Sequence, residues 1–346
     1  MGKLVKKAAT RKNKAVYSVD QLIELYIGDL EEYYPETSED MKKYRAEIAK
    51  QGDEALAKLS LTIMHYCAFR TQNEKVRNML TNRYVGAAAA NILKNKNAKS
   101  IYDLVNFLVD LKNDDERFAN MVIDYKKYSQ AIAATGDLKY NRFWIDSFEE
   151  YDANFEVLIN SNDAESAFFL ANTLELSKED FKKCEETVLN AKNPLISQYF
   201  YELDGANKAK HRKVVISSKN SKVNSRFLSS QKCTVKQAAE HKAALYTSND
   251  ENKLKSIVSA ITSKPELFSE TEINDVVKTL VKTRNTKLAK LMLISDNISV
   301  NVKARLEKLI LNSKDKNAIH TLTNVRFSDQ TRKLAKEREK ELSASM

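Results

Sequence analysis

A polar residue pair that recurs about every 30 residues constrains the fold more than any other feature of this chain. The pair, usually preceded by Ser or Thr, stands before a helical pattern, and its second members are Asp137, Asp163, Asn193, Asn220, Asp250, Asn285 and Asp315. Successive second members are separated by 26, 30, 27, 30, 35 and 30 residues. Self-similarity at such a period is typical of stacked helical repeats.

Each unit of the pattern has the same internal order. A first helix of roughly ten residues follows the polar pair, and a second begins at a capping sequence such as Ser177, Thr234 or Ser269, each with Asp, Gln or Glu three residues on. The second helix ends in an apolar pair such as Val188-Leu189 or Leu280-Val281. One such pair of helices cannot bury its apolar face alone, so we expect neighbouring units to stack.

Composition supports an all-α fold. The 346 residues include only six Gly and three Pro, whereas turn-rich β architectures need both at many turns. We predict a basic, disordered arm over residues 1–16 and an N-terminal helical domain over 17–135, with helix starts at Ser18 and Ser100. An array of about six αα repeats, each of roughly 30 residues, follows over 136–330, and a charged C-terminal helix or tail over 331–346.

The pattern over 136–330 resembles the αα-repeat solenoids of the HEAT and armadillo type, especially the loosely defined short helical repeats common in large bacteriophages. The resemblance rests on the period and the order of helices, and no signature peptide supports it. It implies a stacked, solenoid-like array and leaves the function open.

Positive charge is concentrated in two segments. Residues 208–242 contain ten Lys or Arg and one acid, Glu240, which gives +9 of the chain's net +10. We predict an anion- or partner-binding surface made of Lys208, Lys210, Arg212, Lys213, Lys219, Lys222, Arg226, Lys232 and Lys236. The N-terminal arm adds a second candidate set: Lys3, Lys6, Lys7, Arg11, Lys12 and Lys14.

An acidic run directly precedes the basic one. Residues 146–186 hold twelve acids and three lysines, a net charge of −9. Three interpretations compete: the basic run binds nucleic acid or another anion, the two runs pair within or between copies of the chain, or both are solvated surfaces. Phe227 is the only aromatic residue in the basic run, so any nucleic-acid contact should be sequence-independent and made to the backbone.

The sequence shows no catalytic motif. No phosphate-binding loop, nucleophile elbow or metal-binding helix pattern occurs, and we predict no metal, no cofactor and no small-molecule substrate. His65 and Cys67 are interpreted as core residues, and His211 and His241 as surface residues that could assist anion binding at low pH. The surroundings of Cys184 in a predicted helix should raise the pKa of its thiol.

One enzyme family with a HEAT-like solenoid, the alkylpurine DNA glycosylases, combines tryptophans with an aspartate in its cleft. Here the single Trp144 is followed by Asp146 in an acidic block, where DNA would have to lie. Trp144, Phe143 and Phe148 are better interpreted as an apolar junction between the N-terminal domain and the first repeat.

We therefore expect a non-enzymatic binding or assembly scaffold with a protein partner or self-association favoured. Alternatives are a sequence-independent nucleic-acid-binding protein, a nucleic-acid-processing enzyme whose site is assembled from distant residues, and a virion component. No apolar stretch of membrane-spanning length occurs, and no apolar segment follows the first residues, so we expect a soluble protein of the cytoplasm, or of the host cytoplasm or virion if the source is a phage or other virus.

Overall fold

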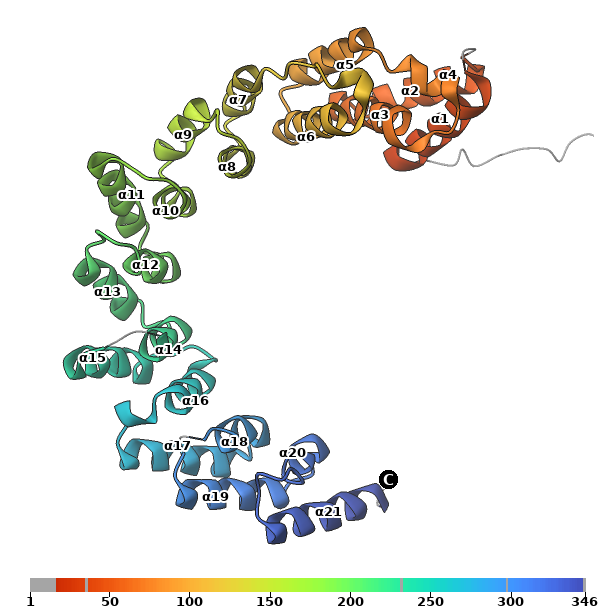
Figure 1. Ribbon diagram of the computed structural model, residues 1–346. Helices are drawn as coiled ribbons and strands as arrows, with labels where there is room; N and C mark the ends of the chain where they lie inside the picture. Colours follow the sequence, from red (N-terminus) through yellow and green to blue (C-terminus); the bar gives the residue numbers. More distant parts are fainter. Residues whose placement is uncertain (1–16, 35–36, 231–232, 297, 345–346) are drawn as a thin grey trace, which may run out of the picture. The chain divides into compact units, whose positions relative to one another are not determined.

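The computed structural model describes residues 17–34, 37–230, 233–296 and 298–344, and within these ranges the regular structure is entirely helical (Figure 1). The all-α prediction is therefore confirmed. The chain divides after Asn162 into two compact units, which are described separately below.

The first unit is built around three mutually packed helices, α3, α5 and α6, and α1, α2 and α7 complete its core. On α6, Ile101, Leu104 and Phe107 are fully buried because they recur on one helical face. The helices of this unit are α1 Val19–Tyr33, α2 Glu39–Lys50, α3 Asp53–His65, α4 Glu74–Met79, α5 Asn82–Lys94, α6 Ala98–Asp114, α7 Tyr125–Ala133, α8 Leu138–Ser147 and α9 Asp152–Ile159. A π-helical turn, Tyr66–Arg70, and a 3-10 turn, Glu116–Phe118, lie between them.

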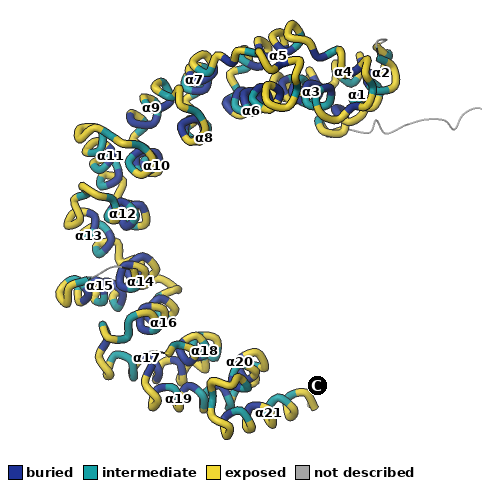
Figure 2. Tube along the Cα trace, viewed as in Figure 1, coloured by how far each residue is buried: buried dark blue, intermediate teal, exposed yellow. Residues whose placement is uncertain are grey.

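The second unit consists of consecutive pairs of packed helices. Its helices are α10 Ala164–Thr173, α11 Lys178–Ala191, α12 Pro194–Tyr201, α13 Lys208–Ser217, α14 Ser221–Ser230, α15 Val235–Tyr246, α16 Lys253–Ser263, α17 Glu270–Thr283, α18 Thr286–Leu293, α19 Val300–Leu311, α20 Lys316–Thr321 and α21 Asp329–Ala344, with a 3-10 turn over Pro265–Leu267. Each even-numbered helix from α10 to α18 contacts the next even-numbered one, and α11 contacts α13, α13 contacts α15, α17 contacts α19 and α19 contacts α21. Figure 2 shows the buried residues of these helices on the sides that face their neighbours.

The recurrent polar residues begin helices, as predicted. The side chains of Asp137, Asp163, Asn193, Asn220, Asn285 and Asp315 accept backbone N–H groups in the first turns of α8, α10, α12, α14, α18 and α20. The Asp250 side chain also accepts a backbone N–H, but the donor is Asn252, the residue directly before the first residue of α16. The predicted capping sequences at Ser18, Ser177, Thr234 and Ser269 also cap their helices.

The buried residues recur at fixed positions relative to each capping residue, and we refer to this set of positions as the register. The residue five positions before the cap is at most 1% exposed in every case: Ile132, Leu158, Val188, Val215, Leu245, Leu280 and Ile310. The residue seven positions after it is at most 4% exposed: Trp144, Leu170, Phe200, Phe227, Ile257, Met292 and Leu322. One fixed spacing of buried side chains thus serves helix pairs of very different sequence.

The register also occurs earlier in the chain than the sequence analysis placed it. Asn97 caps α6, with Ile92 fully buried five residues before it and Leu104 fully buried seven residues after it. The predicted helix start at Ser100 is therefore wrong by three residues, because the Asn97 side chain accepts the Ser100 N–H at 2.8 Å and Ser100 already lies in the first turn.

Successive helix pairs are tied by hydrogen bonds at this register. The Ser221 hydroxyl, at the start of α14, donates to Asp250 Oδ1 at 2.5 Å, and the Thr286 hydroxyl, at the start of α18, donates to Asp315 Oδ2 at 2.7 Å. In both cases a residue just after one cap contacts the carboxylate of the next cap. These bonds hold the pKa of Asp315 below its usual value, and the Ser221 and Ser248 hydroxyls do the same for Asp250 against the opposing effect of desolvation.

The last helix is packed. α21 contacts α19 and α20, Ala335 is fully buried, and the Thr331 hydroxyl donates to Glu307 at 2.9 Å. The sequence-based domain boundary at 135/136 marks the first polar pair, whereas the division after Asn162 reflects compactness. The boundary at 135/136 therefore stays a prediction.

Candidate anion-binding site

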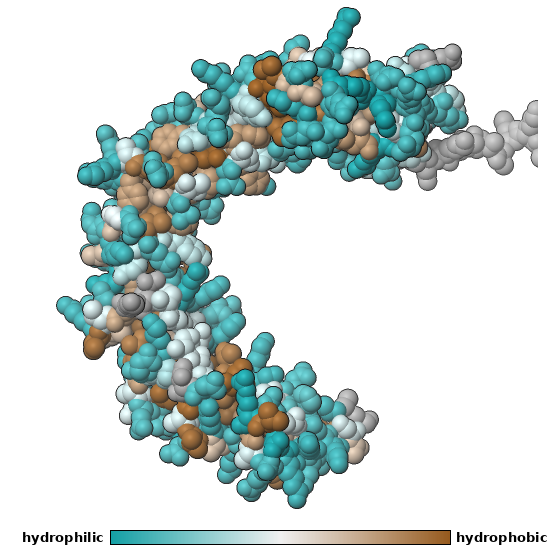
Figure 3. All heavy atoms as spheres, in the orientation of Figure 1, coloured by the Kyte–Doolittle hydropathy of each residue, from teal (hydrophilic) through white to brown (hydrophobic). Residues whose placement is uncertain are grey.

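The predicted cations lie on three helices and one loop of the second unit. α13 carries Lys208, Lys210, Arg212 and Lys213, α14 carries Lys222 and Arg226, and α15 carries Lys236, while Lys219 lies in the loop between α13 and α14. Lys232 and the six cations of the N-terminal arm lie outside the described residues. Over α12–α14 the visible face is mostly hydrophilic (Figure 3).

Several of these cations are engaged with neighbouring side chains. Arg212 forms an ion pair with Glu240, and the guanidinium of Arg226 lies 4.6 Å from the Tyr199 ring centroid and donates to its hydroxyl at 2.6 Å. The Lys208 ammonium lies 5.4 Å from the centroid of the Tyr201 ring. Arg212 and Arg226 connect adjacent helix pairs and Lys208 connects the two helices of one pair, so all three are less available to a ligand.

Two other predicted cations line a groove between α11 and α13. The groove has a volume of about 580 Å³, and its lining consists of Leu189, Lys192, Lys210, Lys213, Val214, Ser217 and Ser218. The three ammonium groups have no hydrogen bond or ion pair with any described residue, and the lining contains no carboxylate. We refer to this feature as the basic groove.

Sequence reasoning missed Lys192 as a site residue. It is the first member of the Lys192-Asn193 pair and adopts a left-handed conformation with φ 51° after the last turn of α11. Gly136 and Asn162 occupy the same register position with φ 68° and 55°, and Gly and Asn tolerate this conformation best. Lys96, Lys219 and Arg284 also occupy this position, with φ between 48° and 51°, so a lysine there gave no signal in the sequence that distinguishes Lys192.

Another face of α13 is buried. His211 is fully buried and stacks on Phe200 with ring centroids 4.9 Å apart, and its Nε2 lies 3.2 Å from Glu185 Oε1. Desolvation lowers the pKa of His211, and Glu185 opposes that shift. Glu185 is thus an acidic-run residue that contacts the basic run.

His241 on α15 repeats this arrangement. It is fully buried and stacks on Phe227 with centroids 4.0 Å apart, and its Nδ1 lies 2.8 Å from Asn224 Oδ1. Desolvation, followed by the charge of Arg212, lowers its pKa to about 4. The interpretation of His211 and His241 as surface residues is therefore wrong: at position 9 before each cap, both point into the core.

The core beneath the basic run contains other polar groups. Ser197 and Gln198 on α12 are fully buried, and their side chains have no hydrogen-bond partner among the described residues. Asn224 is also fully buried but is satisfied, because its amide donates to the carbonyl oxygens of Val215 and Asn220.

The other residues considered for catalysis or metal binding, His65, Cys67 and Cys184, are buried or partly buried in the core. Cys67 is fully buried and His65 packs against Phe107 with centroids 4.6 Å apart, as predicted for core and core-edge residues. Burial raises the pKa of the Cys184 thiol to about 11, with Asp180 as the next contributor. The predicted direction is confirmed, although the charge involved is Asp180 and not the adjacent glutamates. Within the described residues, no cluster of three or more His, Cys, Asp or Glu could hold a metal ion.

Trp144 is fully buried in the core of the first unit. Its indole packs on Phe148 with centroids 4.4 Å apart, and Nε1 donates to the Glu150 carbonyl at 2.7 Å. A tryptophan held in this way has no free face for a nucleobase, unlike the cleft tryptophans of the glycosylase family.

No family model, curated protein or solved structure matches this chain. In the part of the chain that the structure describes, no helix has the length and apolar character needed to cross a bilayer. The function is therefore inferred from the helix register and the basic groove.

Proposed function

We propose that this protein is a non-enzymatic binding scaffold built from αα repeats of the HEAT or armadillo kind. The support is the common register of cap and buried positions, together with the contacts between successive even-numbered and successive odd-numbered helices in the second unit. In such arrays each repeat is stabilised by its neighbours, and binding surfaces extend over several repeats.

The basic groove is the proposed contact site, and its partner is an acidic segment of a protein. The observation that carries this proposal is the set of three ammonium groups, from Lys192, Lys210 and Lys213, that share one groove without any counter-charge. Exposed cations gathered in a concave surface raise the local concentration of an anionic partner. The Ser217 and Ser218 side chains add hydroxyl groups that a carboxylate can contact.

Two features favour a protein segment over a nucleic acid. The groove walls include the apolar side chains of Leu189 and Val214, which can pack on apolar residues of a peptide and gain nothing from a phosphate backbone. The exposed carboxylate of Glu186, which belongs to the acidic run, also lies on α11 and would repel a long polyanion. A short segment with both acidic and apolar residues can pack on the apolar walls and is too short to be strongly repelled by α11.

The test uses a fluorescently labelled peptide of alternating Glu and Leu and measures its anisotropy against the full chain. Lys210→Glu with Lys213→Glu should weaken binding by about a hundredfold or more, because two attractions become repulsions, each worth about tenfold or more. The matched control is Lys278→Glu with Lys282→Glu on α17, which should leave the affinity within about twofold. Equal affinities for the groove variant and wild type would rule out the groove as the site.

Sequence-independent nucleic-acid binding is the second candidate. The observation in its favour is that Lys219, Lys222 and Lys236 are exposed outside the groove and have no ion pair with a described residue. Capture of partners from native cell extract with and without nuclease separates the candidates, because only a nucleic-acid-dependent partner is lost after digestion.

The proposals of a phage or other viral source and of a virion component rest on the resemblance to phage helical repeats alone. Copurification with virus particles is their test. An enzyme site assembled from distant residues stays an alternative prediction.

A further inference from the structure

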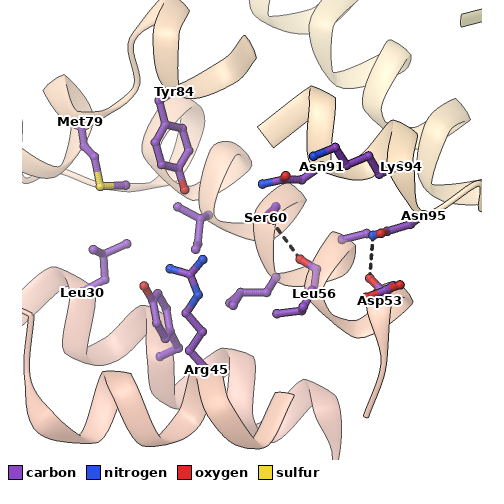
Figure 4. A pocket seen from close by; sticks show the side chains of 14 residues that line it. Leu30, Arg45, Asp53, Leu56, Ser60, Met79, Tyr84, Asn91, Lys94 and Asn95 are labelled. Carbon is purple, nitrogen blue, oxygen red and sulfur yellow. Dashed lines mark hydrogen bonds between the residues drawn. The ribbon is translucent and has the colours of Figure 1, made fainter. Parts of the chain in front are cut away.

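A second cavity, unrelated to the basic groove, lies in the first unit between α1, α2, α3, α4 and α5. Its volume is about 380 Å³, within the range of small-ligand sites. Figure 4 shows Arg45 reaching from α2 toward the centre of this cavity, with Tyr84 of α5 opposite it. We refer to this feature as the Arg45 cavity.

Donors on three of the residues that line the Arg45 cavity lack partners among the described residues. The Arg45 guanidinium has no ion pair or hydrogen bond with any described residue, and neither phenol hydroxyl of Tyr26 or Tyr84 has a described hydrogen-bond partner. Burial raises the pKa of Tyr84 to about 12 and also raises that of Tyr26, in both cases against the opposing charge of Arg45. Both phenols are therefore neutral near pH 7 and can donate hydrogen bonds.

One side of the cavity is apolar and the other polar. Leu30 and Met79 lie on the Tyr84 side, and Leu59 and Ile63 also line the cavity. On the far side are Asn91, Lys94, Asn95 and Asp53, where the Asn95 amide donates to the Asp53 backbone carbonyl at 2.9 Å. The Lys94 ammonium also has no ion pair with a described residue, so the lining carries two unpaired cations and one carboxylate.

This combination selects a particular ligand chemistry. A guanidinium binds a carboxylate through paired charge-assisted hydrogen bonds, and two neutral phenols can donate to the same oxygens. The adjacent apolar wall can pack on an aliphatic group attached to that carboxylate, a contact that an inorganic anion cannot make.

We propose that the Arg45 cavity binds a carboxylate carried on an aliphatic group, with Arg45 as the main anion contact and Tyr26 and Tyr84 as supporting donors. Two sources share this chemistry: a free medium-chain carboxylic acid, and the C-terminal carboxylate of a peptide that ends in an apolar residue. The proposal is independent of the scaffold function, because the basic groove lies in the other unit.

The experiment titrates the full chain by calorimetry with octanoate in one arm and with N-acetyl-Leu-Leu in the other. Binding of octanoate alone identifies a free acid as the ligand class, and binding of the dipeptide identifies a C-terminal carboxylate. The methyl ester of octanoate and the amide of the dipeptide should each bind at least about tenfold more weakly, because they lack the charge that Arg45 recognises.

Variants then assign the site. Arg45→Gln should weaken binding at least about tenfold. Arg83→Gln, a matched change on exposed α5 surface outside the cavity, should leave binding unchanged. Arg45 is itself an exposed residue, so Arg45→Gln should fold normally, and an unchanged thermal unfolding midpoint checks this. No binding of either acid by wild type, or equal binding of acid and uncharged derivative, would overturn the proposal.

Discussion

Two regions of the second unit share one register and differ in what they bury. Nine residues before the cap, α17 and α19 place Val276 and Leu306, whereas α13 and α15 place His211 and His241. Beneath the basic run the core also includes Ser197 and Gln198, whereas α16 and α18 contribute Ile261 and Met292 at fully buried positions. The region α12–α15 thus has a polar core and the region α16–α19 an apolar one.

The difference indicates that the register, and not the chemistry of the side chain, specifies this packing. A histidine stacked on a phenylalanine fills the space that a valine or leucine fills elsewhere. It also introduces buried polar atoms, some without partners, such as His241 Nε2 and His211 Nδ1. Unsatisfied buried groups cost stability, so α12–α15 should open more readily than α16–α19.

The largest effect should come from truncating the buried residue seven positions after a cap. Phe227→Ala should lower the free energy of unfolding by about 3–5 kcal/mol and Met292→Ala by about 2–5 kcal/mol, because both side chains are fully buried. Chemical denaturation of each variant measures this. A loss below about 1 kcal/mol at either site would contradict the shared register.

The next effect is a pH dependence of stability that comes from His241 in the polar region. With a folded pKa of about 4 against an ordinary value of 6.5, His241 contributes stability that is complete above about pH 6.5 and is lost as the pH falls toward 4. The loss from this residue is on the order of 3 kcal/mol. Asn224, Arg212, Glu240 and Phe227 surround it, and none supplies a compensating acceptor at Nε2.

His241→Leu, which copies the residue at the same register position in α19, should remove much of that pH dependence. Urea denaturation of wild type and variant at pH 7 and pH 5 gives the comparison. An equal fall in stability for both proteins would exclude His241 as its source.

A smaller effect concerns the ties between successive helix pairs. Asp315→Ala should destabilise the fold by about 1 kcal/mol, because it removes the cap of α20 and the acceptor of the Thr286 hydroxyl. Asp250→Ala should have a similar effect through Ser221. The double variant Thr286→Val with Asp315→Ala should then lose less than the sum of the single changes, and strict additivity would argue against the tie.

The smallest effect tests whether the basic groove is maintained at the expense of stability. Lys192→Gly should stabilise the chain by up to about 1 kcal/mol, since it relieves a left-handed conformation at a non-glycine residue. The same change should weaken binding of the acidic peptide, since it removes one of three groove cations. A variant that loses stability and keeps full affinity would contradict both roles assigned to Lys192.

Much of the fold could be predicted from local signals. Caps such as Asp163 and Ser269 act within one turn of the chain, so their residue types and spacing identify helix starts. Asn97 was not predicted as a cap because it lies 40 residues before Asp137, and this distance departs from the period of about 30.

The site was less predictable because it depends on contacts between helices. Lys210 and Arg212 are two residues apart in the same basic segment, so the sequence does not distinguish them. Only the packing of α13 against α11 and α15 shows that Lys210 lines the groove and that Arg212 forms an ion pair. The burial of His211 and His241 likewise depends on Phe200 and Phe227 from preceding helices. Residues of five helices line the Arg45 cavity, and no signal in the sequence predicted it.

Hydrogen exchange with and without the acidic peptide tests most directly the claim that a basic groove lies over a polar, easily opened core. Without the peptide, amides of α13 and α15 should exchange faster than those of α17 and α19. With saturating peptide, exchange in α11 and α13 should slow while α17 and α19 stay unchanged. Equal exchange in the two regions, or peptide protection centred on α17–α19, would contradict the account.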